Sequence, residues 1–287
     1  MNKLALGTVQ FGLDYGVANK TGQVDAAEIT RILTAAKQAG VTTLDTAAAY
    51  GLSEKRLGEQ DLAGFQLISK VSAVPNHEDA FPWLKEQCEQ CLQRLKISQL
   101  EGFLLHQPEQ LLSQNGKEIY LALQEIKKLG LVKKIGISVY SPADLDALKQ
   151  YFFDIYQGPY NLLDTRFKKT GWLDRIQNQG AEFHARSAFL QGLLVMPANE
   201  RPEKFDAWQA IWAQWQQWLA TRHLNATTVC LKFSLQEPLI KKVVVGVDSS
   251  QQWQELLAIA AMPPITLPTE FNCEDERLLN PALWSAL

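Results

Sequence analysis

Four side chains in the first part of the chain are of types that can serve one reaction together. Asp45 ends the β-branched run VTTLD, and Tyr50 follows five residues later in the stretch DTAAAYG. Lys70 lies near the end of LISKV, and His106 ends FLLH. An acid, a phenol, an ammonium group and an imidazole therefore follow three successive segments that have the composition of strands.

Transfer of a hydride to a carbonyl group requires this set of groups. The carbonyl oxygen gains negative charge, so an acid must donate a proton to it as the charge forms. A free phenol has a pKa of about 10, and a nearby ammonium group such as Lys70 lowers it by favouring phenolate. A carboxylate such as Asp45 keeps the lysine charged and in place. The imidazole N–H of His106 can orient and polarise the carbonyl oxygen.

Each of the four side chains also has an ordinary explanation. Asp45 could cap a turn, and Lys70 could emerge into solvent at the end of a strand. Tyr50 could pack as a loop aromatic, and His106 could be a core histidine bonded to a backbone carbonyl. We favour the functional interpretation because the four residues together fit one reaction, whereas four unrelated structural roles would not.

The elements that must position these residues alternate along the chain. Short apolar, β-branched runs predict eight strands, at residues 4–7, 42–46, 65–71, 100–106, 132–138, 153–160, 182–188 and 241–247. Helical periodicity lies between them, at residues 25–39, 83–95, 118–129, 143–151, 173–179, 205–219 and 251–261. Such alternation implies parallel strands with right-handed crossovers. We therefore predict an α/β fold, a (β/α)8 TIM barrel that forms a single domain over residues 1–287, with its chemistry at the C-terminal ends of the strands.

The connection before the last strand is longer than one crossover requires. The stretch FDAWQAIWAQWQQWLA carries an apolar stripe at helical spacing, formed by Phe205, Trp208, Trp212, Trp215 and Leu219. A second helix is predicted at residues 225–236. We expect extra helices packed on the barrel wall; a lid or a subunit interface is the alternative.

The composition limits the partners of the protein. The formal net charge is −3 and no lysine or arginine cluster occurs, which argues against nucleic acid. No apolar run approaches about 20 residues and the N-terminal segment has no signal-peptide core, so we expect a cytoplasmic protein without a membrane partner. Cys88 and Cys91 fall on one helical face and are interpreted as buried reduced thiols. The four histidines show no HxH or HExxH spacing, so no metal is expected.

The motifs DTAAAYG with LGE after it, LISKV, FLLHQP, KIGIS, YQGPYN and FLQGLL occur in the order and spacing typical of one family. The chain resembles the aldo-keto reductase superfamily over nearly its whole length, and most of all its sugar-oxidising and polysaccharide-biosynthesis members. The resemblance implies that Asp45, Tyr50, Lys70 and His106 form a catalytic tetrad, with Tyr50 as proton donor or acceptor. It also implies an NAD(P)-dependent oxidoreductase that interconverts a carbonyl group (aldehyde, ketone or sugar) and an alcohol.

The resemblance further implies which residues contact the cofactor. Ser138 and Gln157 match positions that hold the nicotinamide carboxamide, although they could be ordinary polar residues at strand ends. Gln191, Gly192 and Leu193 of FLQGLL match the loop that covers the pyrophosphate, where their backbone would make the contacts.

Two positions depart from the pattern of the family. Many relatives have an aromatic residue at the end of the seventh strand that stacks on the nicotinamide, and this chain has Arg186 there. A guanidinium can stack on a ring, but its charge disfavours the cationic ring of NAD(P)⁺. Arg186 could instead bind an anionic group of the substrate, or form a structural ion pair.

The second departure is Asp248, which follows the eighth strand where NADP-dependent relatives often present a cation. A carboxylate can accept a hydrogen bond from a ribose 2′-hydroxyl but repels a 2′-phosphate. Asp248 could also cap the following helix, beside Ser249 and Ser250. The resemblance favours NADP(H) and Asp248 favours NAD(H), so the preference stays open.

The substrate is expected to be a small carbonyl compound or sugar, and the protein a monomer or weak homo-oligomer. Aromatic residues that could line the substrate pocket are Phe11, Trp83, Trp172 and Trp284. A cofactor-binding regulatory or scaffold barrel with little turnover is the main alternative, against which the intact tetrad argues. A Schiff-base lyase that uses Lys70 is a weaker one, because Asp45 would keep that lysine charged.

Overall fold

The alternation of strands and helices closes into a barrel. The computed structural model describes residues 3–19, 21–75 and 78–287, and its parallel strands pair in chain order until β8 returns to β1. The strands are β1 Leu4–Gly7, β2 Thr43–Asp45, β3 Gln66–Val71, β4 Leu100–Leu105, β5 Val132–Ser138, β6 Ile155–Pro159, β7 Glu182–Arg186 and β8 Ile240–Gly246. The predicted (β/α)8 barrel is confirmed.

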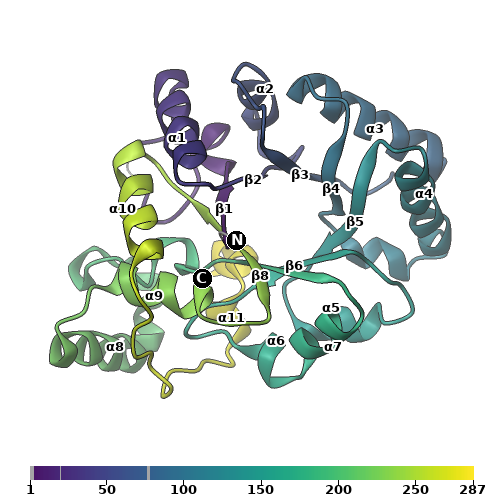
Figure 1. Cartoon of the computed structure of the whole chain (residues 1–287). Coiled ribbons are helices and arrows are strands. Elements are labelled where there is room, and N and C mark those ends of the chain that lie inside the picture. Colours follow the sequence, from purple (N-terminus) through teal and green to yellow (C-terminus); the bar gives the residue numbers. More distant parts are fainter. Residues whose placement is uncertain (1–2, 20, 76–77) are drawn as a thin grey trace.

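Helices surround the ring of strands on the outside (Figure 1). They are α1 Ala26–Gln38, α2 Ser53–Gly58, α3 Ala80–Leu95, α4 Gly116–Lys128, α5 Pro142–Ala147, α6 Arg166–Lys169, α7 Trp172–Asn178, α8 Gln209–Arg222, α9 Ala226–Leu235, α10 Ser250–Ala261 and α11 Glu276–Leu279. Within the described part of the chain, none of these helices is long and apolar enough to cross a membrane.

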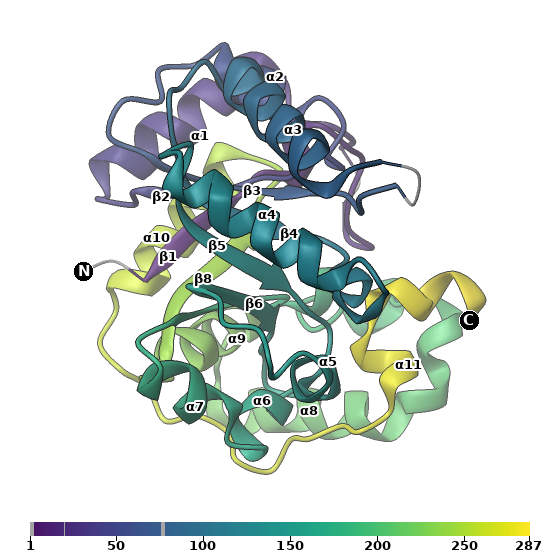
Figure 2. The same cartoon turned by 90° about the vertical axis from the view of Figure 1, so that its right-hand side faces the viewer.

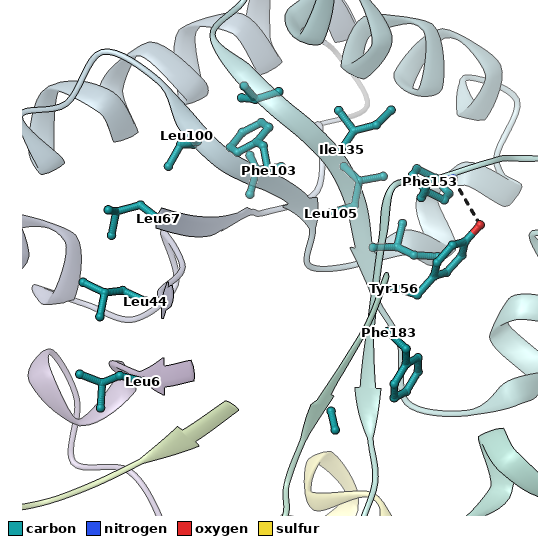
Figure 3. Packing of buried hydrophobic residues seen from close by; sticks show 14 of the residues in the cluster. Leu6, Leu44, Leu67, Leu100, Phe103, Leu105, Ile135, Phe153, Tyr156 and Phe183 are labelled. Atoms are coloured by element: carbon teal, nitrogen blue, oxygen red, sulfur yellow. Dashed lines mark hydrogen bonds between the residues drawn. The ribbon is translucent and has the colours of Figure 1, made fainter. Parts of the chain in front are cut away.

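The side chains of each strand point alternately to the core outside the barrel and to the lumen inside it. Leu6, Leu44 and Leu67 on successive strands belong to the large cluster between the strands and the helices (Figure 3). Because neighbouring side chains on a strand point to opposite faces, Asp45 and Lys70 point inward. The strands whose outer faces bury leucines therefore carry polar groups on their inner faces, at the mouth of the lumen.

The lower part of the lumen is filled by a small apolar cluster. Ile68, Leu104 and Ile155 pack together from β3, β4 and β6. A Cβ atom added at Gly102 would approach the Ile155 side chain to 2.8 Å, so only glycine fits there without displacement. The barrel is a packed core rather than a pore, and the side chains of the site rest on this floor.

The tryptophan-rich helix forms a second core outside the barrel. The stripe residues Phe205, Trp208, Trp212, Trp215 and Leu219 are all buried. They pack with apolar residues of the segments after β6 and β7, of α9, and of the C-terminal tail. The rings of Phe205 and Trp284 lie 4.8 Å apart, and Figure 2 shows the C-terminal segment beside α8.

The expectation of extra helices on the barrel wall is confirmed for α9, which lies against β8 and places Leu231 in the barrel core. Helix α8 differs, because its apolar stripe packs in the second core. The stripe is covered by the tail and by loops above the strands, so it needs neither a lid nor a partner subunit to bury it. Periodicity identifies the apolar face of a helix but not what covers it.

Candidate active site

A buried ion pair lies at the upper end of the lumen. The Lys70 ammonium is 2.5 Å from Asp45 Oδ1, and their side chains are 1% and 3% exposed. Lys70 Nζ also donates to the Thr46 carbonyl at 3.0 Å and to the Tyr50 hydroxyl at 3.4 Å. Burial opposes the charge on Lys70, but the nearby Asp45 carboxylate and Tyr50 phenol raise its pKa above the usual value. Lys70 is therefore charged at neutral pH.

Asp45 is held through both carboxylate oxygens. Oδ1 accepts from Lys70, and Oδ2 accepts a 2.7 Å hydrogen bond from the Gln157 side-chain amide. Asp45 lies on β2 and Gln157 on β6, so this bond crosses the lumen. The link from Gln157 to the ion pair is not visible in the sequence, where the two residues are 112 positions apart.

The loop after β2 fixes the position of Tyr50. A turn closes with the Tyr50 amide donating to Ala47, and the Ser53 amide then donates to the Tyr50 carbonyl. A Cβ atom at Gly12 would lie 1.9 Å from that carbonyl oxygen, so the loop after β1 presses directly on Tyr50. The phenol is therefore aimed from a backbone that is held on two sides.

His106 lies beside Tyr50 directly after β4. Their rings meet edge to face, with centroids 5.9 Å apart. Burial, together with the positive charges of Lys70 and Arg186, lowers the His106 pKa to about 4. The imidazole is therefore neutral at physiological pH and can donate one N–H. The structure thus brings Asp45, Tyr50, Lys70 and His106 together at one site.

A cavity of about 350 Å³ opens beside this cluster. Asp45, Tyr50 and Gln157 form its inner end, and the rest of the lining comes from the ends of β1, β7 and β8, the segments that follow them, Thr227 of α9 and the first turns of α10. The polar, charged and glycine residues in this part of the lining are Gly7, Thr8, Gln10, Tyr15, Gly16, Asn19, Arg186, Ser187, Gln191, Gly192, Thr227, Gly246, Asp248, Gln252 and Glu255. The cavity therefore links the reactive side chains to the beginning of α10.

Two loops meet over the cavity. The Gln191 side-chain amide donates to the Tyr15 hydroxyl at 2.9 Å. Gly192 has φ +94°, and a Cβ atom there would lie 2.5 Å from the Ala18 Cβ. Only glycine permits both this conformation and this close approach. The FLQGLL segment thus packs against the loop after β1.

Not all of the predicted cofactor residues line the cavity. Gln191 and Gly192 do, whereas Leu193 is fully buried in the second core. Ser138 is buried at the end of β5, in register with Gln157, but lies outside the lining.

The aromatic residues expected around the substrate do not line this cavity. Phe11, Trp172 and Trp284 are buried in the two cores, and Trp83 packs against the barrel core from outside. Lining residues that the sequence reasoning missed include Gln10, Tyr15 and Asn19. Their only signal was a position directly after the first strand.

Arg186 ends β7 and lines the cavity with Tyr50. Its guanidinium lies over the Tyr140 ring at 4.3 Å and donates to the Val139 carbonyl at 2.9 Å. The structural ion pair considered from the sequence is absent, because no carboxylate pairs with Arg186 among the described residues.

Asp248 does not cap α10. The N-cap residue is Ser249, whose hydroxyl accepts from the Gln252 amide at 3.2 Å. Asp248 donates its own amide to the Gln252 side chain at 2.8 Å, and its Oδ1 is buried without a partner. Burial raises the Asp248 pKa. An unpaired acceptor thus lies in the lining of the cavity.

A second carboxylate occupies the beginning of α10. Glu28 on α1 accepts a short hydrogen bond from the Ser250 amide and also pairs with Arg31. The bond from Ser250 lowers the Glu28 pKa. Two N-terminal amides of α10, those of Ser250 and Gln252, which would otherwise attract an anion, are therefore already bonded to Glu28 and Ser249.

Among the described residues, neither the cysteines nor the histidines form a metal site. Cys88, Cys91, Cys230 and Cys273 are buried free thiols. Burial raises the pKa of Cys88 to about 12 and that of Cys91 well above its usual value. No group of three or more metal-ligating side chains occurs in the part of the chain that the structure describes, which leaves out His77.

A closed parallel barrel that places the buried Asp45–Lys70 ion pair and the half-buried Tyr50 at one end of a cavity suits proton-coupled hydride transfer, the chemistry of an oxidoreductase. The sequence model of the "Aldo/keto reductase family" matches residues 3–268, and the chain belongs to this family. It is accordingly an NAD(P)-dependent oxidoreductase that interconverts carbonyl and alcohol groups.

Individual relatives are distant. The chain is 24% identical to an L-glyceraldehyde 3-phosphate reductase of Escherichia coli O157:H7, over 90% of this chain and 86% of that protein. It is 26% identical to a D-threo-aldose 1-dehydrogenase of a Pseudomonas species, over 87% and 89% of the two chains. An aldo-keto reductase structure from Bacillus halodurans superposes with a TM-score of 0.72, at 21% identity, over 92% and 88% of the chains.

Proposed function

We propose that Tyr50 exchanges the proton when this oxidoreductase reduces a carbonyl group or oxidises an alcohol. The observation that carries the proposal is the contact series from the buried Asp45–Lys70 ion pair to the hydroxyl of the half-buried Tyr50. The nicotinamide supplies or accepts the hydride. The Lys70 ammonium, 3.4 Å from the phenol oxygen, favours phenolate, so the Tyr50 proton can move to the carbonyl oxygen as negative charge forms there.

Asp45 and Gln157 act on the reaction through Lys70. A lysine that is 1% exposed would lose its proton without a counterion, because burial disfavours the charged form. Asp45 prevents this loss, and Gln157 fixes the second oxygen of Asp45. The charge that tunes Tyr50 is therefore present and immobile before the substrate binds.

His106 supplies the second donor to the carbonyl oxygen. Its pKa of about 4 keeps the imidazole neutral, so its N–H can polarise the carbonyl without competing with Tyr50 as the acid. This division gives each side chain one role: His106 orients the carbonyl and Tyr50 transfers the proton.

The chemistry of the cavity fits a nicotinamide dinucleotide. Gln10 Oε1 and Asp248 Oδ1 are buried acceptors that have no partner among the described side chains, and both residues line the cavity. Hydroxyl and amide donors of a dinucleotide can satisfy such acceptors. Gln191 and Gly192 would contact the pyrophosphate through their backbone, and Gln157 would contact the nicotinamide end. Ser138 is in register with Gln157 but lies outside the lining.

We propose that NAD(H) is preferred over NADP(H). Asp248 lines the cavity, and its carboxylate has an unpaired oxygen that is buried in this conformation. Turned toward the cavity, the carboxylate would accept from a ribose hydroxyl and would repel a 2′-phosphate. Glu28 already occupies an N-terminal amide of α10 as an anion would. Arg186 at the other end is the one cation in the cavity lining as far as residues are described.

The substrate class is inferred from the relatives. The names of two relatives specify an aldehyde phosphate and an aldose. We therefore propose that a small aldehyde, ketone or sugar enters beside Tyr50 and His106.

The proposal is tested by titrating the purified protein with NADH and NADPH. Quenching of its eight tryptophans and energy transfer to bound nicotinamide report the dissociation constant of each cofactor. A panel of aldehydes and sugars is then assayed for oxidation of the tighter cofactor. Tight binding with turnover supports the proposal. Binding without turnover on any carbonyl compound would favour a regulatory barrel, and binding of neither cofactor would contradict the proposal.

A further inference from the structure

Arg186 is a cation at the mouth of the site without a paired anion. Its guanidinium donates to the Val139 carbonyl at 2.9 Å and reaches the Ser187 hydroxyl at 3.4 Å, both neutral groups. No carboxylate lies within ion-pair distance of it in the described ranges. A guanidinium carries more N–H donors than these two bonds use, so several remain available.

Arg166 is the contrasting case in the same region. It pairs with Asp164 at 2.8 Å and also with Glu276, and it donates to the Tyr140 carbonyl. Tyr140 therefore lies between two arginines. The charge of Arg166 is neutralised by carboxylates, whereas that of Arg186 is not. The missing carboxylate alone does not distinguish Arg186, because within the described part of the chain Arg56 also donates only to backbone carbonyls, those of Phe11 and Val24. Arg186 differs in that it lines the cavity with Tyr50.

The surroundings of Arg186 prepare it to bind an anion. The Tyr140 ring supports one face of the guanidinium at 4.3 Å and holds it in a fixed plane. The cavity contains Asp45 as a possible counterion, but both Asp45 oxygens are already bonded to Lys70 and Gln157. The positive charge of Arg186 is thus left for a molecule that enters the cavity.

We propose that Arg186 binds an anionic oxygen group, a phosphate or a carboxylate, on the carbonyl substrate. Arg186 and Tyr50 line the same cavity, so a short substrate can place its carbonyl at Tyr50 and its anionic end at Arg186. The planar guanidinium suits the paired oxygens of either group. This inference rests on the proposed function and specifies the class of substrate.

The first experiment compares matched neutral and anionic substrates. Steady-state kcat/KM is measured with NADH or NADPH for glyceraldehyde and glyceraldehyde 3-phosphate, and for butanal and succinic semialdehyde. The wild-type protein is expected to prefer the anionic member of at least one pair by about 10- to 100-fold, as one charge-assisted hydrogen-bonded contact provides. The pair that shows the preference distinguishes a phosphate from a carboxylate.

Variants of Arg186 then test whether its guanidinium causes the preference for the anionic substrate. Arg186→Gln should lose most of the preference through a higher KM for the anionic substrate, so that kcat/KM falls at least about tenfold more for the anionic substrate than for its neutral partner. Arg186→Lys should keep part of it, because an ammonium retains charge without the fork geometry. Arg175→Gln, an exposed arginine outside the cavity lining, controls for the loss of one positive charge.

A binding measurement separates this inference from the proposed function. Glycerol 3-phosphate and glycerol are titrated by calorimetry into the protein saturated with cofactor. Tighter binding of the phosphate that is lost in Arg186→Gln, with cofactor affinity unchanged, supports the inference even for a slow enzyme. Equal kcat/KM within each pair, or a variant that weakens cofactor binding and affects neutral and anionic substrates alike, would overturn it and leave the oxidoreductase proposal standing.

Discussion

The side-chain amide of Gln157 donates a 2.7 Å hydrogen bond to Asp45 across the lumen of the barrel. Both residues are at most 2% exposed, so the carboxylate oxygen has no water to replace this donor. Gln157→Met keeps the length of the side chain and removes the donor. We expect its free energy of unfolding to fall by about 1–3 kcal/mol, the cost of an unsatisfied buried acceptor.

Urea unfolding measures this change. Gln93→Met, on the exposed face of α3, is the matched control and should stay within about 0.5 kcal/mol of the wild type. If both variants were equally stable, the bond across the lumen would contribute nothing to the folded state.

Tyr50→Phe tests the proton donor. Without the hydroxyl, kcat for carbonyl reduction should fall by about 10²- to 10⁴-fold, the usual contribution of a positioned general acid. The phenyl ring keeps its edge-to-face contact with His106, so the affinity for cofactor should change little. Turnover close to that of the wild type would show that another group donates the proton.

The neutral state of His106 makes a prediction about stability against pH. Its pKa is about 4 in the folded protein, below the ordinary value of 6.5. As the pH falls below 6.5, the unfolded chain takes up a proton that the folded chain refuses, so the free energy of unfolding decreases until the pH reaches about 4.

When the pH falls from 7 to 5, the free energy of unfolding should therefore decrease less for His106→Gln than for the wild type. Urea unfolding at both pH values gives the comparison. The buried His184, whose pKa is also lowered by burial, is present in both proteins and cancels. Identical decreases in the two proteins would argue that His106 titrates normally.

Asp248→Arg tests the cofactor preference. Replacing the unpaired carboxylate with a cation should raise kcat/KM for NADPH relative to NADH by about tenfold or more, since one charge-assisted contact is gained and one repulsion is lost. Glu28→Gln should add a smaller shift, because the amide oxygen still accepts from Ser250 without its charge. Asp61→Asn, an exposed acid paired with Lys37, controls for net charge. A constant ratio in all variants would exclude both acids as determinants.

Gly58, the glycine of the LGE motif, lies where there is no room for a side chain. A Cβ atom at Gly58 would lie 1.9 Å from the backbone carbonyl oxygen of Arg94, so α2 and α3 touch directly there. Gly58→Ala should lower the free energy of unfolding by about 1–3 kcal/mol through overpacking. Gly130→Ala meets no atom within 4 Å but has φ +76°, so a cost of about 1 kcal/mol from backbone conformation alone is expected there. Thermal unfolding compares the two, and a Gly58 variant no worse than the Gly130 variant would contradict the close contact.

The sequence predicted the barrel because each strand carries its own local signal. Every predicted strand lies within two residues of its observed bounds. Helix α2, at Ser53–Gly58, was missed because six residues are too few for helical periodicity to show. The helix predicted at residues 143–151 ends at Ala147 instead.

Part of the site was also predictable, because its residues lie at the ends of strands that have local signals. Asp45, Lys70 and His106 stand at strand ends, where chain order alone brings side chains to one mouth. The bond from Gln157 to Asp45 and the contact of Glu28 with Ser250 join residues 112 and 222 positions apart. Such pairs depend on the closed geometry of the barrel and leave no local pattern.

The second core connects the FLQGLL segment, which lines the cavity, to the C-terminal tail. Leu190, Leu193 and Leu194 belong to it and flank Gln191 and Gly192, which line the cavity, while Phe271 and Trp284 of the C-terminal tail belong to it as well. A ligand that orders the FLQGLL segment must therefore also stabilise the docking of the tail, and the two equilibria are linked reciprocally. Amide hydrogen exchange in the last residues of the chain should then report occupancy of a cavity that those residues do not touch.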